Sequence, residues 1–76
     1  MFGATVELYQ RPKKLLQKSR QQRWFFQCRA ANGFDILTVS QEPYFNKGGA
    51  YEAIYAAHPG LIIQEVTYET AMRHRR

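Results

Sequence analysis

Apolar and polar residues alternate with a period of two in the first half of the chain, and this pattern predicts β-strands. Residues 5–9 follow it. Residues 24–30 follow it too, and their alternation places Phe26 on one face of the strand and Phe25 on the other. A third strand is predicted over residues 34–40, where apolar side chains fall on both faces.

The remaining segments complete a β-β-β-α-β order. Asn32-Gly33 predicts a tight hairpin turn between the second and third strands, because both residue types tolerate positive φ. Apolar residues recur with a helical period over residues 47–57, which predicts a helix. Residues 61–66 are apolar on both faces, so we expect a fourth strand inside the sheet. Residues 68–76 form a polar, basic tail with one or two helical turns.

Size and composition favour one small folded domain. The chain has 76 residues, of which 45% are apolar, so we expect an α+β domain over residues 1–67 followed by the tail. A domain of this size buries only about 60% of its unfolded surface, and Cys28, the only cysteine, cannot form an internal disulfide. A second subunit is one way to add burial. The sequence shows neither a long apolar run nor a secretory leader, so we expect a cytoplasmic protein without a membrane segment.

Positive charge is concentrated in residues 11–23, within a chain of net charge +5. This segment has no acidic residue and six basic ones, namely Arg11, Lys13, Lys14, Lys18, Arg20 and Arg23. Trp24 follows at once and adds a surface for base stacking. We therefore interpret these seven residues as a candidate nucleic-acid-binding surface. The alternative is a solvated connection that only keeps the protein soluble.

Phe25 supports a different hypothesis. If its side chain points outward from the sheet beside the basic segment, the open sheet face could anchor a protein partner. The protein would then be an interaction module. Composition does not separate these two functions.

The sequence contains no recognisable set of catalytic or metal-binding residues. Cys28 shares the predicted core face with Phe26, where burial makes a thiol inert. His58 and His74 have no cysteine or carboxylate constellation around them. Residues 46–49 could bind an anion at the start of a helix, but we interpret them as an N-cap with a close contact between helix and sheet. We expect a non-enzymatic protein without a cofactor or metal.

Residues 26–33 read Phe-Gln-Cys-Arg-Ala-Ala-Asn-Gly, and further matches to one pattern are Ser40, Tyr44, Asn46, Lys47 and Ile54. In this pattern the chain resembles the YegP-like family of small bacterial domains. The resemblance implies a homodimer in which two β-β-β-α-β units share one antiparallel sheet and exchange their fourth strands. It implies no activity and no binding residue. The segment 11–23 is longer and more basic than the turn usual in that family.

Overall fold

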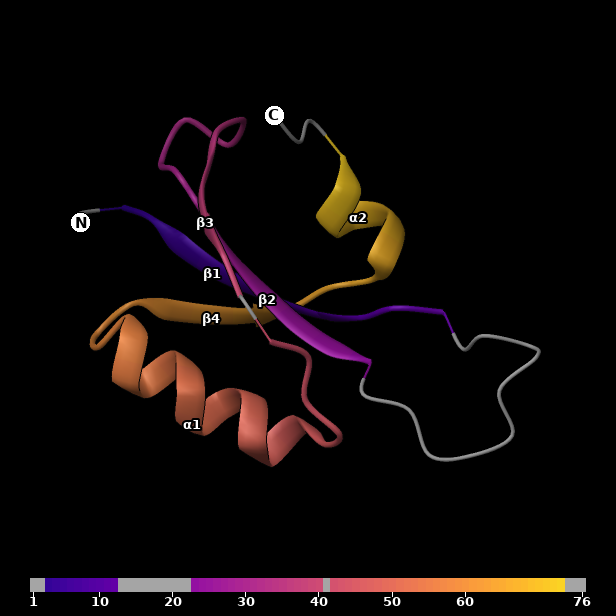
Figure 1. Ribbon diagram of the computed structural model, residues 1–76. Helices are drawn as coiled ribbons and strands as arrows, with labels where there is room; N and C mark the ends of the chain where they lie inside the picture. The colour runs from indigo at the N-terminus through magenta and orange to yellow at the C-terminus, as the bar shows by residue number, and fades with distance from the viewer. Residues whose placement is uncertain (1–2, 13–22, 41, 74–76) are drawn as a thin grey trace.

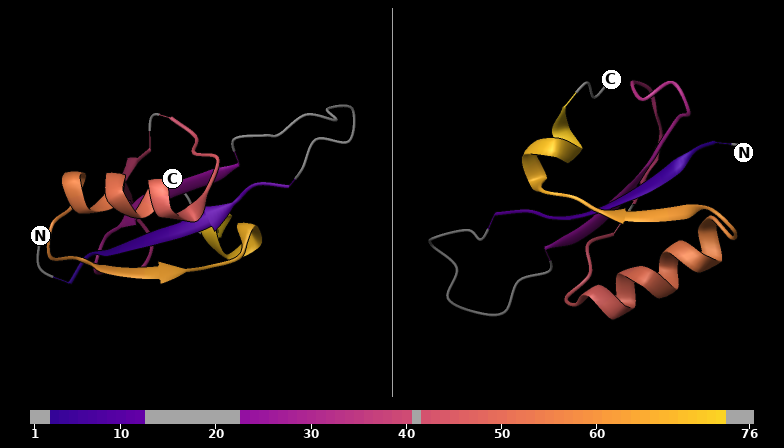
Figure 2. Two further views of the ribbon diagram at one scale, coloured as in Figure 1. Left: turned by 90° about the horizontal axis from the view of Figure 1, so that it is seen from below. Right: turned by 180° about the vertical axis from the view of Figure 1, so that it is seen from behind.

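A four-stranded sheet lies between two helices in the computed structural model, which describes residues 3–12, 23–40 and 42–73 (Figure 1). The elements are β1 (Thr5–Gln10), β2 (Trp24–Arg29), β3 (Ile36–Val39), α1 (Lys47–Ala57), β4 (Ile62–Glu65) and α2 (Tyr68–Met72). The helices α1 and α2 lie on opposite sides of the sheet (Figure 2). The expected α+β class and element order are therefore confirmed, and the tail contributes a short helix.

The sheet is mixed, whereas we expected it to be antiparallel. Its strand order is β3-β2-β1-β4, and β4 runs parallel to β1 with Ile63 opposite Val6. The reason is that α1 carries the chain back along the sheet, so that β4 starts from the same end as β1. Within the single chain β4 is also an edge strand and not an interior one, and its Ile62 is 68% exposed.

The apolar core lies between the sheet and α1. It consists of Val6, Leu8, Phe26, Ala50 and Ile54. The bounds of α1 are those predicted, because Ala50 and Ile54 repeat at helical spacing and are both fully buried. Fully burying a side chain such as Leu8 or Ile54 contributes about 1.5–3 kcal/mol, so this face supplies much of the stability of the fold.

The connection between β2 and β3 is longer than the two-residue turn that Asn32-Gly33 predicts. The Ala30 amide donates to Asp35 O (2.8 Å), and the Gly33 amide donates to Ala30 O (2.9 Å). Gly33 therefore follows the centre of the turn, where it has a φ of 81°. The Asn32 side chain explains the difference, because its Oδ1 accepts from the amides of Phe34 (2.8 Å) and Asp35 (3.1 Å) and so stabilises a wider loop.

Replacing Gly33 with Val should destabilise the protein through backbone strain alone. A Cβ at this position would meet nothing within 4 Å, so no steric contact with the rest of the molecule is involved. A β-branched residue at positive φ is strained, and we expect a loss of more than about 1 kcal/mol in urea unfolding. Gly33→Asn should lose less, because asparagine tolerates this region. Equal stability of the Val variant and the native protein would contradict the turn geometry.

Candidate nucleic-acid interface

The basic segment leaves the sheet at the end of the β1–β2 pair. The register of these strands ends with Gln10 opposite Trp24. Beyond it the Arg11 amide donates to Arg23 O (2.9 Å), and Arg23 Nε donates to Arg11 O (2.8 Å). These two bonds hold the first and last residues of segment 11–23 side by side. The other cations of the segment, Lys13, Lys14, Lys18 and Arg20, lie outside the described residues.

A row of stacked side chains runs from this point across the sheet. The Arg11 guanidinium carbon lies 4.1 Å from the centre of the Phe25 ring. Phe25 lies opposite Tyr9 in the register, and their ring centres are 6.0 Å apart with the planes 18° from parallel. Tyr68 of α2 continues the row, with its ring centre 6.2 Å from that of Tyr9. Phe25 thus lies on the face opposite the α1 core, as its position in the strand predicts.

Trp24 lies on the other face of the sheet. Its half-buried ring packs against the core under α1, and Lys47 Nζ is 5.9 Å from the ring centre. Backbone bonds with Tyr44 (3.0 and 2.9 Å) fix this part of the strand. Trp24 and Phe25 therefore cannot form one stacking surface, because successive side chains of a strand point to opposite faces.

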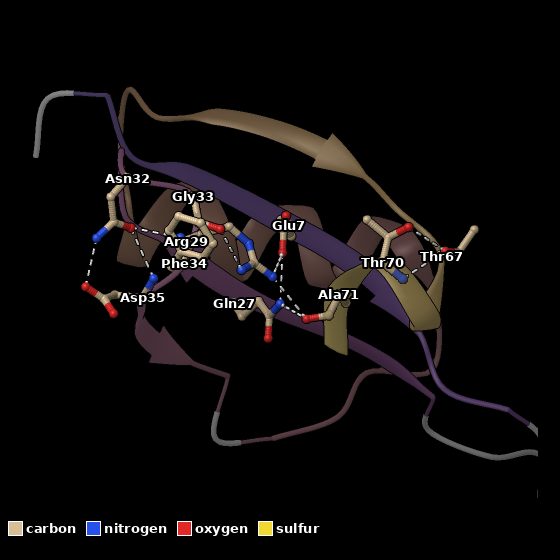
Figure 3. A network of polar contacts seen from close by, with 10 residues as sticks. All are labelled: Glu7, Gln27, Arg29, Asn32, Gly33, Phe34, Asp35, Thr67, Thr70 and Ala71. Carbon is tan, nitrogen blue, oxygen red and sulfur yellow. Dashed lines mark hydrogen bonds and ion pairs between the residues drawn. The ribbon is translucent and has the colours of Figure 1, made fainter. Parts of the chain in front are cut away.

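A buried polar network joins the centre of the sheet to α2 (Figure 3). Arg29 forms an ion pair with Glu7 (3.0 Å), and Gln27 Nε2 donates to the same carboxylate oxygen (2.8 Å). Both side chains also donate to the carbonyl oxygen of Ala71 in α2, Gln27 at 2.6 Å and Arg29 at 3.2 Å. A second Arg29 bond, to Gly33 O (3.2 Å), ties the network to the loop between β2 and β3.

Helix α2 covers the sheet face that the protein-interaction hypothesis takes to be open. Ala71 is fully buried there, and the Thr67 side chain caps the helix by accepting from the Thr70 amide (3.1 Å). Two buried polar atoms of residues on this face, Tyr9 Oη and Gln27 Oε1, have no hydrogen-bond partner among the described residues. Each such atom costs about 1–3 kcal/mol relative to a satisfied one.

The pattern of residues along the chain does not predict this polar face. Gln27 and Arg29 alternate with apolar residues in the strand of Phe25, so the pattern shows that they share a face with it. It does not show that Glu7 lies directly opposite Gln27, because the register appears only when β1 and β2 are paired. Nothing in the sequence indicates that Ala71 lies above them.

Cys28 and His58 both pack against other parts of the fold. Cys28 is buried, and this burial raises the pKa of its thiol. His58 Nε2 lies 3.1 Å from Thr38 Oγ1, and the imidazole stands edge-on to Phe26 beside an open groove of about 360 Å³ between β3 and α1. The described parts of the chain contain no group of three or more potential metal ligands. His74 lies outside them.

The start of α1 is an N-cap, as interpreted from residues 46–49. Asn46 Oδ1 accepts from the Gly49 amide (2.7 Å), and a Cβ on Gly49 would meet this oxygen at 3.3 Å. The small residue therefore makes room for the cap, not for the sheet as we expected. Lys47 pairs with Glu65 of β4 (3.0 Å).

Glu65 receives a second hydrogen bond from Tyr51 (2.8 Å). The Lys47 and Tyr51 bonds hold the pKa of this carboxyl below its usual range, and the bond to Glu65 raises the pKa of Tyr51. The charge of Lys47 is thus balanced within the protein, which leaves segment 11–23 as the strongest source of positive charge.

Comparisons with known proteins place the chain in no family. No protein-family model, curated protein or solved structure matches it. The resemblance to the YegP-like domains stays a hypothesis. Among the residues that the structure describes, no helix has the length and apolar character needed to cross a membrane.

Replacing Arg29 with Met should strongly destabilise the protein. The substitution leaves the Glu7 carboxylate, whose side chain is only 9% exposed, without its cation. Breaking a buried ion pair in this way costs about 3–5 kcal/mol, which urea unfolding would measure. The double variant Arg29→Met, Glu7→Leu removes both charges and should recover most of the loss. A single variant as stable as the native protein would show that the pair is solvated.

Proposed function

We propose that this protein is a non-enzymatic module that binds nucleic acid through the basic segment 11–23. The observation that carries the proposal is the pairing of Arg11 with Arg23 at the end of the two central strands. The pairing holds the ends of a segment with six basic residues and no acidic one at the end of the β1–β2 pair. Positive charge anchored in this way suits the phosphate backbone, which provides most of the affinity in such complexes.

Arg11 contributes more than charge to this proposal. Its guanidinium is exposed and lies on the Phe25 ring, so one side chain offers both hydrogen-bond donors and a planar surface next to the segment. Guanidinium groups bind phosphate in a bidentate manner and stack on aromatic rings and bases. Lysines in the segment would add affinity without sequence preference. The expected complex is therefore one with little sequence specificity.

Binding of labelled DNA or RNA, followed by fluorescence anisotropy over a range of salt concentrations, tests the proposal. Each neutralised phosphate on duplex DNA contributes about −0.9 to the slope of log affinity against log salt. Three or four contacts should thus give a slope near −3. If neither single nor double strands bind at about 50 mM salt, where such attraction is strong, the proposal is wrong. A pull-down comparing the native protein with Phe25→Ala would then test the protein-interaction hypothesis.

A pair of charge-matched variants locates the binding surface. Replacing Lys13, Lys14 and Lys18 with Gln should weaken binding to all sequences and flatten the salt slope. Replacing Arg73, Arg75 and Arg76 with Gln removes the same charge from the C-terminal tail. We expect the tail variant to lose much less affinity. Equal losses in the two variants would mean that net charge, and not segment 11–23, attracts the ligand.

We also propose that two copies of the chain associate, as the resemblance to the YegP-like domains implies. The exposed Ile62 on the edge strand β4 supports this, because edge strands with apolar side chains favour pairing with a second chain. A dimer would double the charge next to a polyanion. Light scattering at micromolar concentration should give about twice the monomer mass, and Ile62→Lys should shift it toward the monomer. A folded native monomer would contradict association.

A further inference from the structure

The sheet face beneath α2 carries two aromatic rings in an arrangement suited to nucleotide bases. Tyr9 and Phe25 lie side by side on the adjacent strands β1 and β2, with nearly parallel planes. The Arg11 guanidinium carbon lies over the Phe25 ring, 4.1 Å from its centre, so one face of this ring already receives a cationic group. Proteins that bind single strands use such aromatic side chains because every base has a face that can stack.

Hydrogen-bonding groups lie next to these rings. The Gln27 amide has one oxygen without a partner among the described residues, and its nitrogen is held partly by the Ala71 carbonyl of α2. An amide with a free donor and acceptor can pair with the edge of a base. Arg29 also gives one of its bonds to Ala71. Glu7 is the only acidic group in this network, and its charge is balanced by Arg29.

The cover over this face is small. Helix α2 has five residues, and Ala71 is its only fully buried side chain in the part of the tail that the structure describes. A helix this short is not stable by itself in water. While it is docked, Tyr9 Oη and Gln27 Oε1 stay buried without partners in the described structure. Undocking would lose the bonds to Ala71 but would let water or a ligand satisfy these two atoms.

We infer that this face, with Tyr9, Phe25, Gln27 and Arg29, is a binding surface for single-stranded nucleic acid, and that α2 is a displaceable cover on it. The inference rests on the proposed function, since the strand would enter from segment 11–23 beside Arg11 and continue across the sheet. Duplexes would bind through the segment alone, because their bases have no free faces. The protein would therefore distinguish single from double strands by whether α2 moves.

Two matched substitutions in α2 test the cover. Ala71→Leu places extra carbons where the native side chain is fully buried and should force α2 away from the sheet. Thr70→Leu adds the same side chain at an exposed position of the same helix; it gives up the exposed hydrogen bond from Thr67 Oγ1 to Thr70 Oγ1 (2.9 Å) but leaves the buried contact of Ala71 with the sheet intact. The probe is a labelled oligoadenylate of about 12 nucleotides, within the range that single-strand sites cover. If α2 is undocked about a tenth of the time, Ala71→Leu should tighten binding up to about tenfold, whereas Thr70→Leu should not.

Hydrogen exchange in the native protein gives a measurement that does not depend on a variant folding. The amides of Ala71 and Arg73 donate to Thr67 O (2.9 Å) and Thr70 O (3.2 Å) and so report on α2. Their exchange should become faster when oligoadenylate binds and stay unchanged when a duplex of the same length binds. Phe25→Ala should weaken oligoadenylate binding about tenfold and leave duplex binding nearly unchanged.

The possible results separate this inference from the proposed function. Suppose that both probes bind with the expected salt dependence, but that hydrogen exchange of α2 is unchanged and Ala71→Leu has no effect on affinity. This result would overturn the displaceable cover and leave segment 11–23 as the site. Slower exchange of α2 amides on oligoadenylate binding would also overturn it. No binding of either probe at about 50 mM salt would overturn both. If Ala71→Leu proves unfolded by circular dichroism, the native exchange data decide.

Discussion

The ion pair between Arg29 and Glu7 determines how the second face of the sheet must be built. Glu7 lies in the middle of β1 and Arg29 at the end of β2, and their side chains are only 9% and 10% exposed. Charges removed from water to this extent need every available hydrogen bond, and here Gln27 and the Ala71 carbonyl provide them. Arg29 also donates to Gly33 O, so that one side chain contacts both α2 and the loop between β2 and β3. The C-terminal segment is thus tied to the sheet by polar atoms as well as by the contacts of Tyr68 and Ala71.

The two faces of the sheet are therefore held by different forces. Under α1 the contacts are apolar, and separating Ile54 from Leu8 and Phe26 would expose hydrocarbon to water. Under α2 the contacts are mostly hydrogen bonds, which water can replace with little net loss. The α1 face is suited to stability, whereas the α2 face is suited to exchange.

The sequence predicts most of the elements because their signals are local. The bounds of α1 follow from the Asn46 cap and the spacing of Ala50 and Ile54, and the opposite orientations of Phe25 and Phe26 follow from strand alternation. The errors concern pairing over distance. The direction of β4 and its position at the edge depend on which strand it pairs with. The apolar residues of β4 do not determine this partner. The Asn32 side chain widened a turn that the residue types alone predict to be tight.

The candidate site also combines features that are visible in the local sequence with features that depend on strand pairing. Charge in segment 11–23 is visible in the sequence, whereas the network of Glu7, Gln27 and Arg29 needs the register of β1 with β2. Both features belong to this one strand pair: the network extends from its middle to the Arg29 end, and the segment leaves from the other end. Arg11 lies between the segment and the covered face. Its carbonyl oxygen accepts from Arg23 at the other end of the segment, and its guanidinium lies over the Phe25 ring. In the proposed complex, a ligand held by the segment would lie at the edge of the covered face. For a single strand, whose bases are free to stack, the next available rings are Phe25 and Tyr9, and α2 is what lies above them.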